Sequence, residues 1–311
     1  MNIKLSIILP CYNEEKSLPI LFKEIEAVMN SLGIKYEIIA IDDGSKDNTF
    51  AVLSKLKRKF KQLKIIKHRG NWGKSTALQN GFDKAVGEII ITMDSDLQDN
   101  PKEIPRFLKK LEEGYDLVSG WKKNRHDPIH FVIMSRILNN FLIPTLTGLT
   151  IHDTNCGFKA YRKEVAKSLN LYGELYRYIP VIVSKDNYKV GEISVDHRPR
   201  KYGISKYGFS KNIKGLVDLF TIIFLTGYVK RPGHFFGGFG ILLFGVGFLI
   251  GIYITYLRIT TGSIQFRQPL LFLGVLLIVV GIQLTTTGLL AELLVYLRQT
   301  SKDNSVDKKL D

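Results

Sequence analysis

The chain has 311 residues, enough for more than one domain, and its 44 lysines and arginines outnumber its 29 aspartates and glutamates, giving a formal net charge of +15. That excess favours anionic partners such as nucleic acids, phosphorylated ligands or lipid headgroups. The two cysteines, Cys11 and Cys156, form no C-x-x-C motif, which excludes a disulfide-rich domain and fits a reducing compartment.

Segments with strand and helix patterns alternate along the first two-thirds of the chain. The apolar run at the N-terminus is too short for a signal peptide and is typical of a first strand. We expect strands at residues 4–9, 37–41, 64–67, 88–93 and 117–119, with helices between the first four. This alternation predicts an α/β fold with a mostly parallel sheet and helices on both faces.

Polar motifs follow the first four strands, at what a parallel sheet makes a single edge. They are P-C-Y-N-E at 10–14, I-D-D-G-S at 41–45, N-W-G-K at 71–74 and D-S-D-L-Q-D at 94–99. Open α/β folds bind ligands at this edge. Asp94 and Asp96 stand one residue apart there and can share Mg²⁺ or Mn²⁺ with phosphate oxygens. A solvated turn after the strand is the alternative for D-x-D alone.

The order and spacing of these four motifs resemble those of the family 2 glycosyltransferases. Within that family the chain is similar to the polyprenyl-phosphate glycosyltransferases, the group that includes dolichyl-phosphate mannose synthase. The resemblance covers essentially the whole chain. It implies a GT-A (Rossmann-like) nucleotide-sugar-binding domain and a hexosyltransferase of the EC 2.4.1 type. Such an enzyme moves one sugar from a UDP- or GDP-hexose to undecaprenyl or dolichyl phosphate, with inversion at the anomeric carbon.

The resemblance also implies roles for the donor-side residues. Lys74 either donates to a phosphate or simply begins its helix. Asp94, Asp96 and Gln98 would hold Mg²⁺ or Mn²⁺ and, through it, the diphosphate, with Asp96 counted among the catalytic residues. Those that would line the nucleotide pocket are Pro10, Tyr12, Glu14, Asp42 or Asp43, and Asp94.

Later segments carry the candidates for the acceptor and for catalysis. Lys122, Arg125, Ser135 and Arg136 are candidates for the acceptor lipid phosphate, although a surface role is open for each basic residue. The segment H-D-T-N-C-G-F-K at 152–159 resembles the one beside the reacting sugar in relatives. It makes Asp153 the candidate base, although some relatives carry an aspartate at the position of Gly157. A lipid monophosphate has a second pKa of about 6 and needs no strong base.

One further loop of the family has a counterpart here. R-K-Y-G-I-S-K at 200–206 resembles the loop that closes over the donor diphosphate in relatives. Arg200, Ser205 and Lys206 would donate to phosphate oxygens there, and Arg200 is a candidate catalytic residue.

The last third of the chain has a membrane pattern. Two uncharged apolar segments, at about 235–257 and 269–291, are each long enough to span a bilayer. We expect a catalytic domain at 1–207, an amphipathic interfacial helix at 208–232, a transmembrane hairpin at 233–298 and a charged tail at 299–311. An ordinary core helix is the alternative for 208–232. We place the catalytic domain in the cytosol and leave homo-oligomers open.

Two other functions compete with this interpretation. A processive polysaccharide synthase shares the D-x-D domain but usually carries Q-x-x-R-W, and neither Trp72 nor Trp121 follows an arginine. A non-catalytic lipid-binding or lipid-translocating protein would not need both D-x-D carboxylates. The resemblance therefore implies a nucleotide sugar, a polyprenyl phosphate and a lipid bilayer as partners, and no nucleic acid.

Overall fold

The computed structural model describes residues 3–123, 144, 148–199, 232–264 and 266–299. The chain divides into two units, Met1–Asp218 and Leu219–Asp311, and each is described by itself. The predicted interfacial helix at 208–232 lies almost wholly outside the described residues, as does the tail from residue 300 onward.

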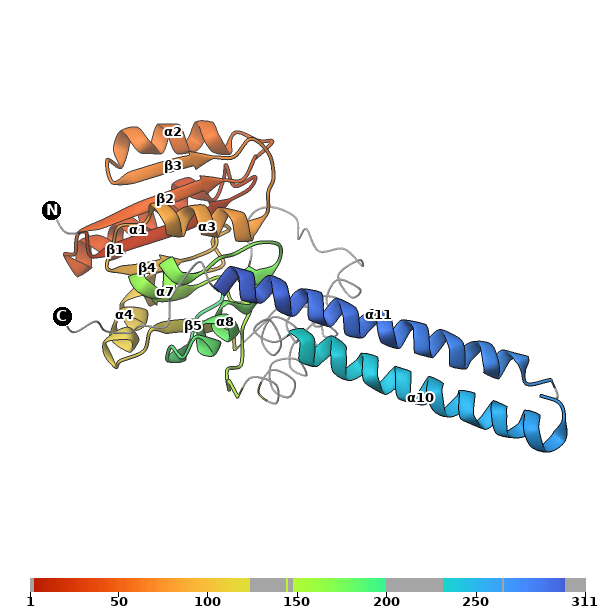
Figure 1. Cartoon of the computed structure of the whole chain (residues 1–311). Helices are drawn as coiled ribbons and strands as arrows, with labels where there is room; N and C mark the ends of the chain where they lie inside the picture. Colours follow the sequence, from red (N-terminus) through yellow and green to blue (C-terminus); the bar gives the residue numbers. More distant parts are fainter. Residues whose placement is uncertain (1–2, 124–143, 145–147, 200–231, 265, 300–311) are drawn as a thin grey trace. The chain divides into compact units, whose positions relative to one another are not determined.

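A seven-stranded sheet in the order β3-β2-β1-β4-β6-β5-β7 forms the centre of the first unit (Figure 1). Strand β6 pairs antiparallel with β4 and β5, while the other pairings are parallel. The α/β prediction and the mostly parallel sheet are confirmed, with β6 and β7 as additions. The strands are β1 (Leu5–Cys11), β2 (Tyr36–Asp42), β3 (Leu63–Lys67), β4 (Ile89–Thr92), β5 (Leu117–Trp121), β6 (Lys159–Arg162) and β7 (Val190–Ser194).

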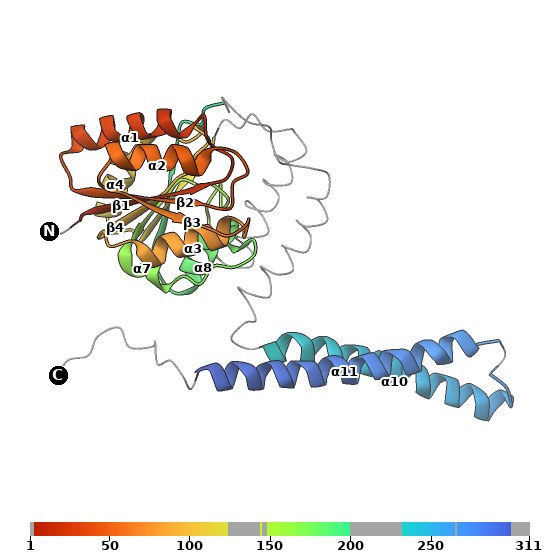
Figure 2. The ribbon, with the colours of Figure 1, turned by 90° about the horizontal axis from the view of Figure 1, so that it is seen from above.

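Helices cover both faces of this sheet (Figure 2). On one face lie α1 (Leu18–Leu32), α2 (Thr49–Lys59) and α4 (Ile104–Glu112), the last preceded by the short η1 (Pro101–Glu103). On the other lie α3 (Lys74–Lys84), α7 (Lys163–Ser168) and α8 (Ile179–Lys185), the last preceded by η3 (Leu175–Tyr178). Because β1 is covered on both sides, its residues are apolar almost throughout rather than in alternation.

The direction of each strand decides which loops meet. In parallel β1, β2 and β4, Cys11 lies opposite Asp42 and Ile8 opposite Thr92, so all three strands end at one edge. Because β6 is antiparallel, it begins at that edge, with Lys159 opposite Thr92. The topology thereby brings residues 152–158 beside the D-S-D-L-Q-D motif, about 60 residues earlier in the chain.

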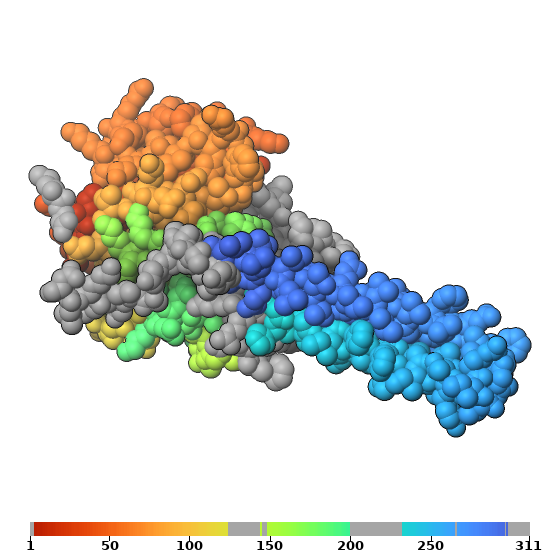
Figure 3. Space-filling view, viewed as in Figure 1, coloured from red at the N-terminus to blue at the C-terminus, as the bar shows by residue number. Residues whose placement is uncertain are grey.

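The second unit is a hairpin of two long helices, α10 (Pro232–Thr261) and α11 (Gln268–Gln299), which pack side by side (Figure 3). Both are long and apolar enough to cross a membrane. Glycines set their spacing. An added Cβ at Gly240 would lie 2.6 Å from the carbonyl oxygen of Gly281, and one at Gly247 would lie 2.6 Å from that of Gly274. Small residues at these positions let the two backbones approach closely.

The glycines of α10 differ in what surrounds them, which gives a matched test. We expect Gly240→Leu to lower the melting temperature of the detergent-purified protein, because the leucine side chain would force the helices apart. Gly245→Leu is the control, since nothing lies within 4 Å of a Cβ added there. The melting temperature of each variant is measured by heating samples and running them on size-exclusion chromatography. Equal melting temperatures for the two would contradict the close packing.

Candidate active site

The loops that follow β1 and β2 are tied to each other. The backbone N–H of Asn13 donates to Ser45 Oγ (3.0 Å), and that of Lys46 donates to Asn13 Oδ1 (2.8 Å). The N–H of Glu14 donates to Thr49 Oγ1 (2.7 Å), while Ser17 Oγ donates to the Glu14 carboxylate (2.6 Å). These hydrogen bonds therefore fix the segment from Pro10 to Glu14 at the edge of the sheet.

Asp42 and Asp43, the two carboxylates at the end of β2, have different surroundings. The carboxylate of Asp43 accepts from His68 Nδ1 (2.8 Å) and from the backbone N–H groups of Trp72 (2.8 Å) and Gly73 (2.9 Å). Asp42 Oδ1 accepts from the N–H of Ser45 (3.0 Å), whereas its buried Oδ2 has no hydrogen-bond partner among the described residues. Asp43 thus fixes the N-W-G-K loop, whereas Asp42 fixes the turn at Ser45.

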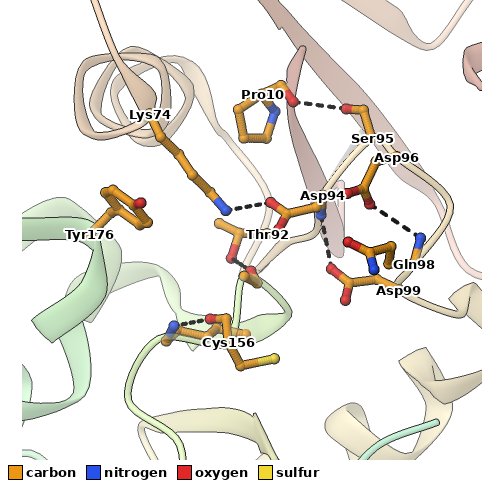
Figure 4. A network of polar contacts seen from close by, with 12 residues as sticks. Pro10, Lys74, Thr92, Asp94, Ser95, Asp96, Gln98, Asp99, Cys156 and Tyr176 are labelled. Atoms are coloured by element: carbon orange, nitrogen blue, oxygen red, sulfur yellow. Dashed lines mark hydrogen bonds and ion pairs between the residues drawn. The ribbon is translucent and has the colours of Figure 1, made fainter. Parts of the chain in front are cut away.

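Asp94 lies in the middle of a polar network (Figure 4). Its carboxylate forms an ion pair with Lys74 at the start of α3, and its backbone N–H donates to Asp99 Oδ2 (2.9 Å). Burial would raise the pKa of Asp94, but the ammonium groups of Lys74 and then Lys122 outweigh burial and lower it to about 2. Asp94 is thus held as an anion beside two cations.

Asp96 and Gln98 lie on the loop that leaves Asp94. Asp96 is buried, and its Oδ1 accepts from the backbone N–H of Gln98 (3.2 Å). Leu97 between them has a positive φ of 66°, so the loop turns sharply there. Among the described residues, no three His, Cys, Asp or Glu side chains already gather closely enough to hold a metal ion. The oxygen donors of Asp94, Asp96 and Gln98 fit a hard divalent cation whose remaining ligands are phosphate oxygens and water.

Lys122 approaches the same network from the end of β5. Its Nζ lies 3.6 Å from Asp99 Oδ1, and its side chain is 14 % exposed. Burial would lower the pKa of Lys122, but Asp99 and other neighbouring charges raise it above its usual range. The pKa of Asp99 is raised, chiefly by burial. Lys74 therefore pairs with Asp94 and Lys122 with Asp99, and the charges of both lysines act on Asp94.

Segment 152–159 lies beside these charges. Asp153 is 1 % exposed, and its Oδ1 accepts from the N–H of Asn155 (3.1 Å). Thr92 Oγ1 donates to the carbonyl of Gly157 (2.8 Å), which fastens the segment to the end of β4. A Cβ at Gly157 would lie 2.6 Å from Asp94 Oδ2. The glycine thus makes the room that the Asp94 carboxylate occupies.

Lys159, at the start of β6, is a buried amine near these carboxylates. It donates to the carbonyl of Cys156, and burial lowers its pKa from 10.5 to about 8 although Cys156, Asp153 and Asp94 raise it. The folded chain releases this proton near pH 8, whereas the unfolded chain keeps it up to pH 10.5. The unfolded state binds more protons between these values, so stability rises with pH there.

The lowered pKa of Lys159 should make the stability of the protein depend on pH. Relative to Lys159→Met, we expect the free energy of unfolding of the wild type to increase by about 3 kcal/mol between pH 8 and 10.5, at 1.36 kcal/mol per pKa unit. Denaturant unfolding of both proteins across that range measures the difference. A constant difference would show that Lys159 is protonated throughout. Lys163→Met, on the neighbouring helix, is the control.

Residues 195–199 run along the D-x-D loop. The N–H of Arg198 donates to the carbonyl of Gln98 (3.0 Å), and His197 forms a β-bridge with Asp99. The guanidinium of Arg198 also binds both carboxylate oxygens of Glu24 on α1, at 3.0 and 2.9 Å. Residues 195–199 are therefore anchored beside Gln98 where they lead into the R-K-Y-G-I-S-K segment.

The described residues thus bring Pro10, Asp42, Lys74, the D-x-D carboxylates, Lys122 and Asp153 to one edge of the sheet. Asp99, Lys159 and Tyr176 were not singled out from the sequence. Only the pairing of distant segments brings these three residues to the site. Tyr176, for example, has its ring centre 5.2 Å from Lys74 Nζ. The predicted site residues that lie outside the described residues are Arg125, Ser135, Arg136, Arg200, Ser205 and Lys206.

The sequence is similar to those of known glycosyltransferases. The family model described as "Glycosyl transferase family 2" matches residues 6–169. The dodecaprenyl-phosphate galacturonate synthase of Rhizobium johnstonii is 36% identical over 99% of this chain and 93% of its own length. The undecaprenyl-phosphate 4-deoxy-4-formamido-L-arabinose transferase of Photorhabdus laumondii is 34% identical over 93% of this chain and 88% of its own length.

Solved structures show the same fold. The glucosyl-3-phosphoglycerate synthase of Mycobacterium tuberculosis, in complex with Mn²⁺ and UDP-glucose, matches with a TM-score of 0.53 and 20% identity. The match covers 72% of this chain and 77% of that chain. At this identity the likeness concerns the fold alone.

Proposed function

The chain belongs to glycosyl transferase family 2, and we propose that it transfers one sugar from a UDP- or GDP-sugar to a polyprenyl phosphate. One observation supports this best. Lys74, on the side of the nucleotide-type loops, pairs with Asp94, and Lys122, on the side of β5, lies 3.6 Å from Asp99, whose carboxylate accepts the backbone N–H of Asp94. A reaction between a diphosphate donor and a phosphate acceptor requires two anion sites that meet at one centre. The relatives' names, which pair a sugar with dodecaprenyl or undecaprenyl phosphate, agree with this arrangement.

On the donor side, the nucleoside would lie against residues 10–14 and the end of β2. Asp42 is our candidate for a hydrogen bond to the base or ribose, because its Oδ2 has no partner among the described residues. Asp43 supports the pocket instead by holding the Trp72 and Gly73 amides. Lys74 would exchange its ion pair with Asp94 for one with the diphosphate. Both anions would remain within its reach.

Asp94, Asp96 and Gln98 would hold a divalent cation, Mg²⁺ or Mn²⁺, together with the diphosphate. When bound, the cation neutralises the charge that builds on the leaving nucleoside diphosphate. The Asp94 carboxylate is suited to this task because its lowered pKa keeps it ionised at any physiological pH. The loop at 200–206 is our candidate for covering the diphosphate, since residues 195–199 are anchored next to Gln98.

On the acceptor side, Lys122 would bind the lipid phosphate and aim one of its oxygens at the anomeric carbon. The new bond forms between that oxygen and the anomeric carbon while the bond to the nucleoside diphosphate breaks, so a single displacement inverts the configuration. An ionised phosphate carries no proton that must be removed. Asp153, buried beside Lys122 and Lys159, would then orient these cations rather than act as an obligatory base.

The hairpin of α10 and α11 would anchor this reaction at the bilayer, where a polyprenyl phosphate resides. We place the catalytic unit in the cytosol, where nucleotide sugars are made. A cysteine introduced at Ser263, between the two helices, should then react with impermeant maleimide only from the outer face of intact cells. Labelling only after lysis would reverse the proposed orientation.

The activity itself is tested by transfer of radiolabelled sugar to polyprenyl phosphate in detergent. The donor panel contains UDP- and GDP-hexoses and also the galacturonate and 4-deoxy-4-formamido-L-arabinose donors suggested by the relatives' names. We expect one labelled lipid from one donor, formed with Mn²⁺ or Mg²⁺ and absent with EDTA. Labelled product from no donor, despite intact nucleotide binding, would refute the proposal and favour a lipid-binding or lipid-translocating protein.

A further inference from the structure

Asp99 is a buried carboxylate that the proposed reaction does not use directly. It is 1 % exposed, and its two oxygens face different partners. Oδ2 accepts the backbone N–H of Asp94 at 2.9 Å, and Oδ1 lies 3.6 Å from Lys122 Nζ. One side chain therefore contacts the candidate metal ligand of the donor side and the candidate phosphate ligand of the acceptor side.

The backbone around Asp99 is also fixed. The residue bridges to His197, and the carbonyl of the preceding Gln98 accepts the N–H of Arg198 at 3.0 Å. Asn100, the next residue, accepts the N–H of Lys102 at 3.1 Å and so begins η1. Because these contacts hold the backbone on both sides, the Asp99 carboxylate has a defined position and can impose that position on a flexible lysine.

We infer that Asp99 is a positioning residue that couples the two substrate sites, holding Lys122 where the acceptor phosphate arrives while it fixes the backbone of Asp94. The inference rests on the proposed function. Without this carboxylate, the long Lys122 side chain would lose the ion pair that holds it in place. The acceptor phosphate would then no longer find a cation held at its site.

Replacement by asparagine separates the two contacts of Asp99. The amide oxygen of Asp99→Asn can still accept the N–H of Asp94, so the D-x-D loop keeps its hydrogen bond. The amide nitrogen then faces Lys122, where two donors meet and the ion pair is lost. A variant of the same shape therefore preserves the donor-side contact and removes the acceptor-side one. Asp99→Ser, also neutral and able to accept a hydrogen bond, is the second variant.

Two binding measurements on the full-length protein in detergent test the inference. Farnesyl phosphate reports the acceptor site by microscale thermophoresis, and UDP with Mn²⁺ reports the donor site by calorimetry. We expect Asp99→Asn to weaken farnesyl phosphate binding about tenfold and to change UDP–Mn²⁺ binding less than about twofold. Glu113→Gln, which removes a carboxylate from the exposed pair with Lys110, is the matched control and should change neither.

A double-mutant cycle with Lys122→Met distinguishes positioning from a general structural effect. If Asp99 acts through Lys122, adding Asp99→Asn to Lys122→Met weakens farnesyl phosphate binding no further. Additive losses, or equal losses for both ligands, would overturn the inference. A wild type that makes no sugar-lipid product refutes the proposed function. A wild type that makes it, while Asp99→Asn binds farnesyl phosphate normally, refutes only the role of Asp99.

Discussion

Asp96→Asn is expected to lose at least about 100-fold in sugar transfer while remaining folded, because the change removes one of the two carboxylates proposed to hold the divalent cation. The asparagine oxygen can still accept the N–H of Gln98 that Asp96 Oδ1 accepts at 3.2 Å, so the loop should keep its shape. Transfer of labelled sugar, measured against Mn²⁺ concentration, gives the loss in rate. Electron paramagnetic resonance of free Mn²⁺ gives the loss in affinity separately.

Asp83→Asn is the control for this variant. Asp83 is an exposed carboxylate on α3, where its side chain accepts from Gln79 at 3.0 Å, so the same chemical change there should leave transfer and Mn²⁺ affinity intact. If Asp96→Asn bound Mn²⁺ and UDP as the wild type does and still transferred sugar, the cation would have to lie elsewhere. The proposed reaction would then depend on Lys74 and Lys122 alone for charge neutralisation.

The first part of the sheet was predictable because each element carried its own local signal. Strands β1, β2 and β4 are largely apolar runs, and α1 shows buried Leu18, Leu21, Phe22 and Ile25 at helical spacing. Strand β6 had no such signal, because K-A-Y-R is short and polar at both ends. Its place in the sheet depends on pairing with β4, about 70 residues away, and no local pattern reports such a partner.

The same limit applies to the site. The polar strand ends made Asp42, Asp94 and Asp96 candidates, because parallel strands deliver their ends to one edge. The different surroundings of Asp42 and Asp43 could not be predicted from two adjacent letters. They depend on the three donors that surround Asp43, two of which come from a loop about 30 residues later. Asp99 was visible in D-S-D-L-Q-D, but only the approach of Lys122 from β5 distinguishes it from a solvated turn residue.

The charges at this edge of the sheet also affect how tightly a divalent cation would bind there. Lys74 pairs with Asp94 and Lys122 with Asp99, so each of these two carboxylates already has a cation beside it. A cation and a diphosphate that arrive together bring their own charges and can replace the Lys74 contact. A cation alone would have to compete with an ammonium group that is already in place. We therefore expect cation affinity to rise when the nucleotide is bound.

Gly157→Ala should lose about 100-fold in sugar transfer, since a displacement of about 1 Å at a reacting centre is enough for such a loss. The added Cβ would lie 2.6 Å from Asp94 Oδ2 and 2.7 Å from Asp94 Cγ. The carboxylate cannot retreat easily, because Lys74 holds its oxygen and Asp99 holds its backbone N–H. UDP–Mn²⁺ calorimetry and the transfer assay measure the effect, with Gly245→Ala in the hairpin as the control.

The result also bears on the residue type that position 157 can hold. An aspartate at position 157 would collide with Asp94 even more than an alanine does, because its larger side chain begins with the same Cβ. Asp153 is the one carboxylate of segment 152–159 in this chain, and Gly157 leaves the space that the Asp94 carboxylate occupies. Unchanged UDP–Mn²⁺ binding and transfer in Gly157→Ala would show that Asp94 moves freely. The network of Lys74, Asp94 and Asp99 would then not be the fixed frame from which the donor site is built.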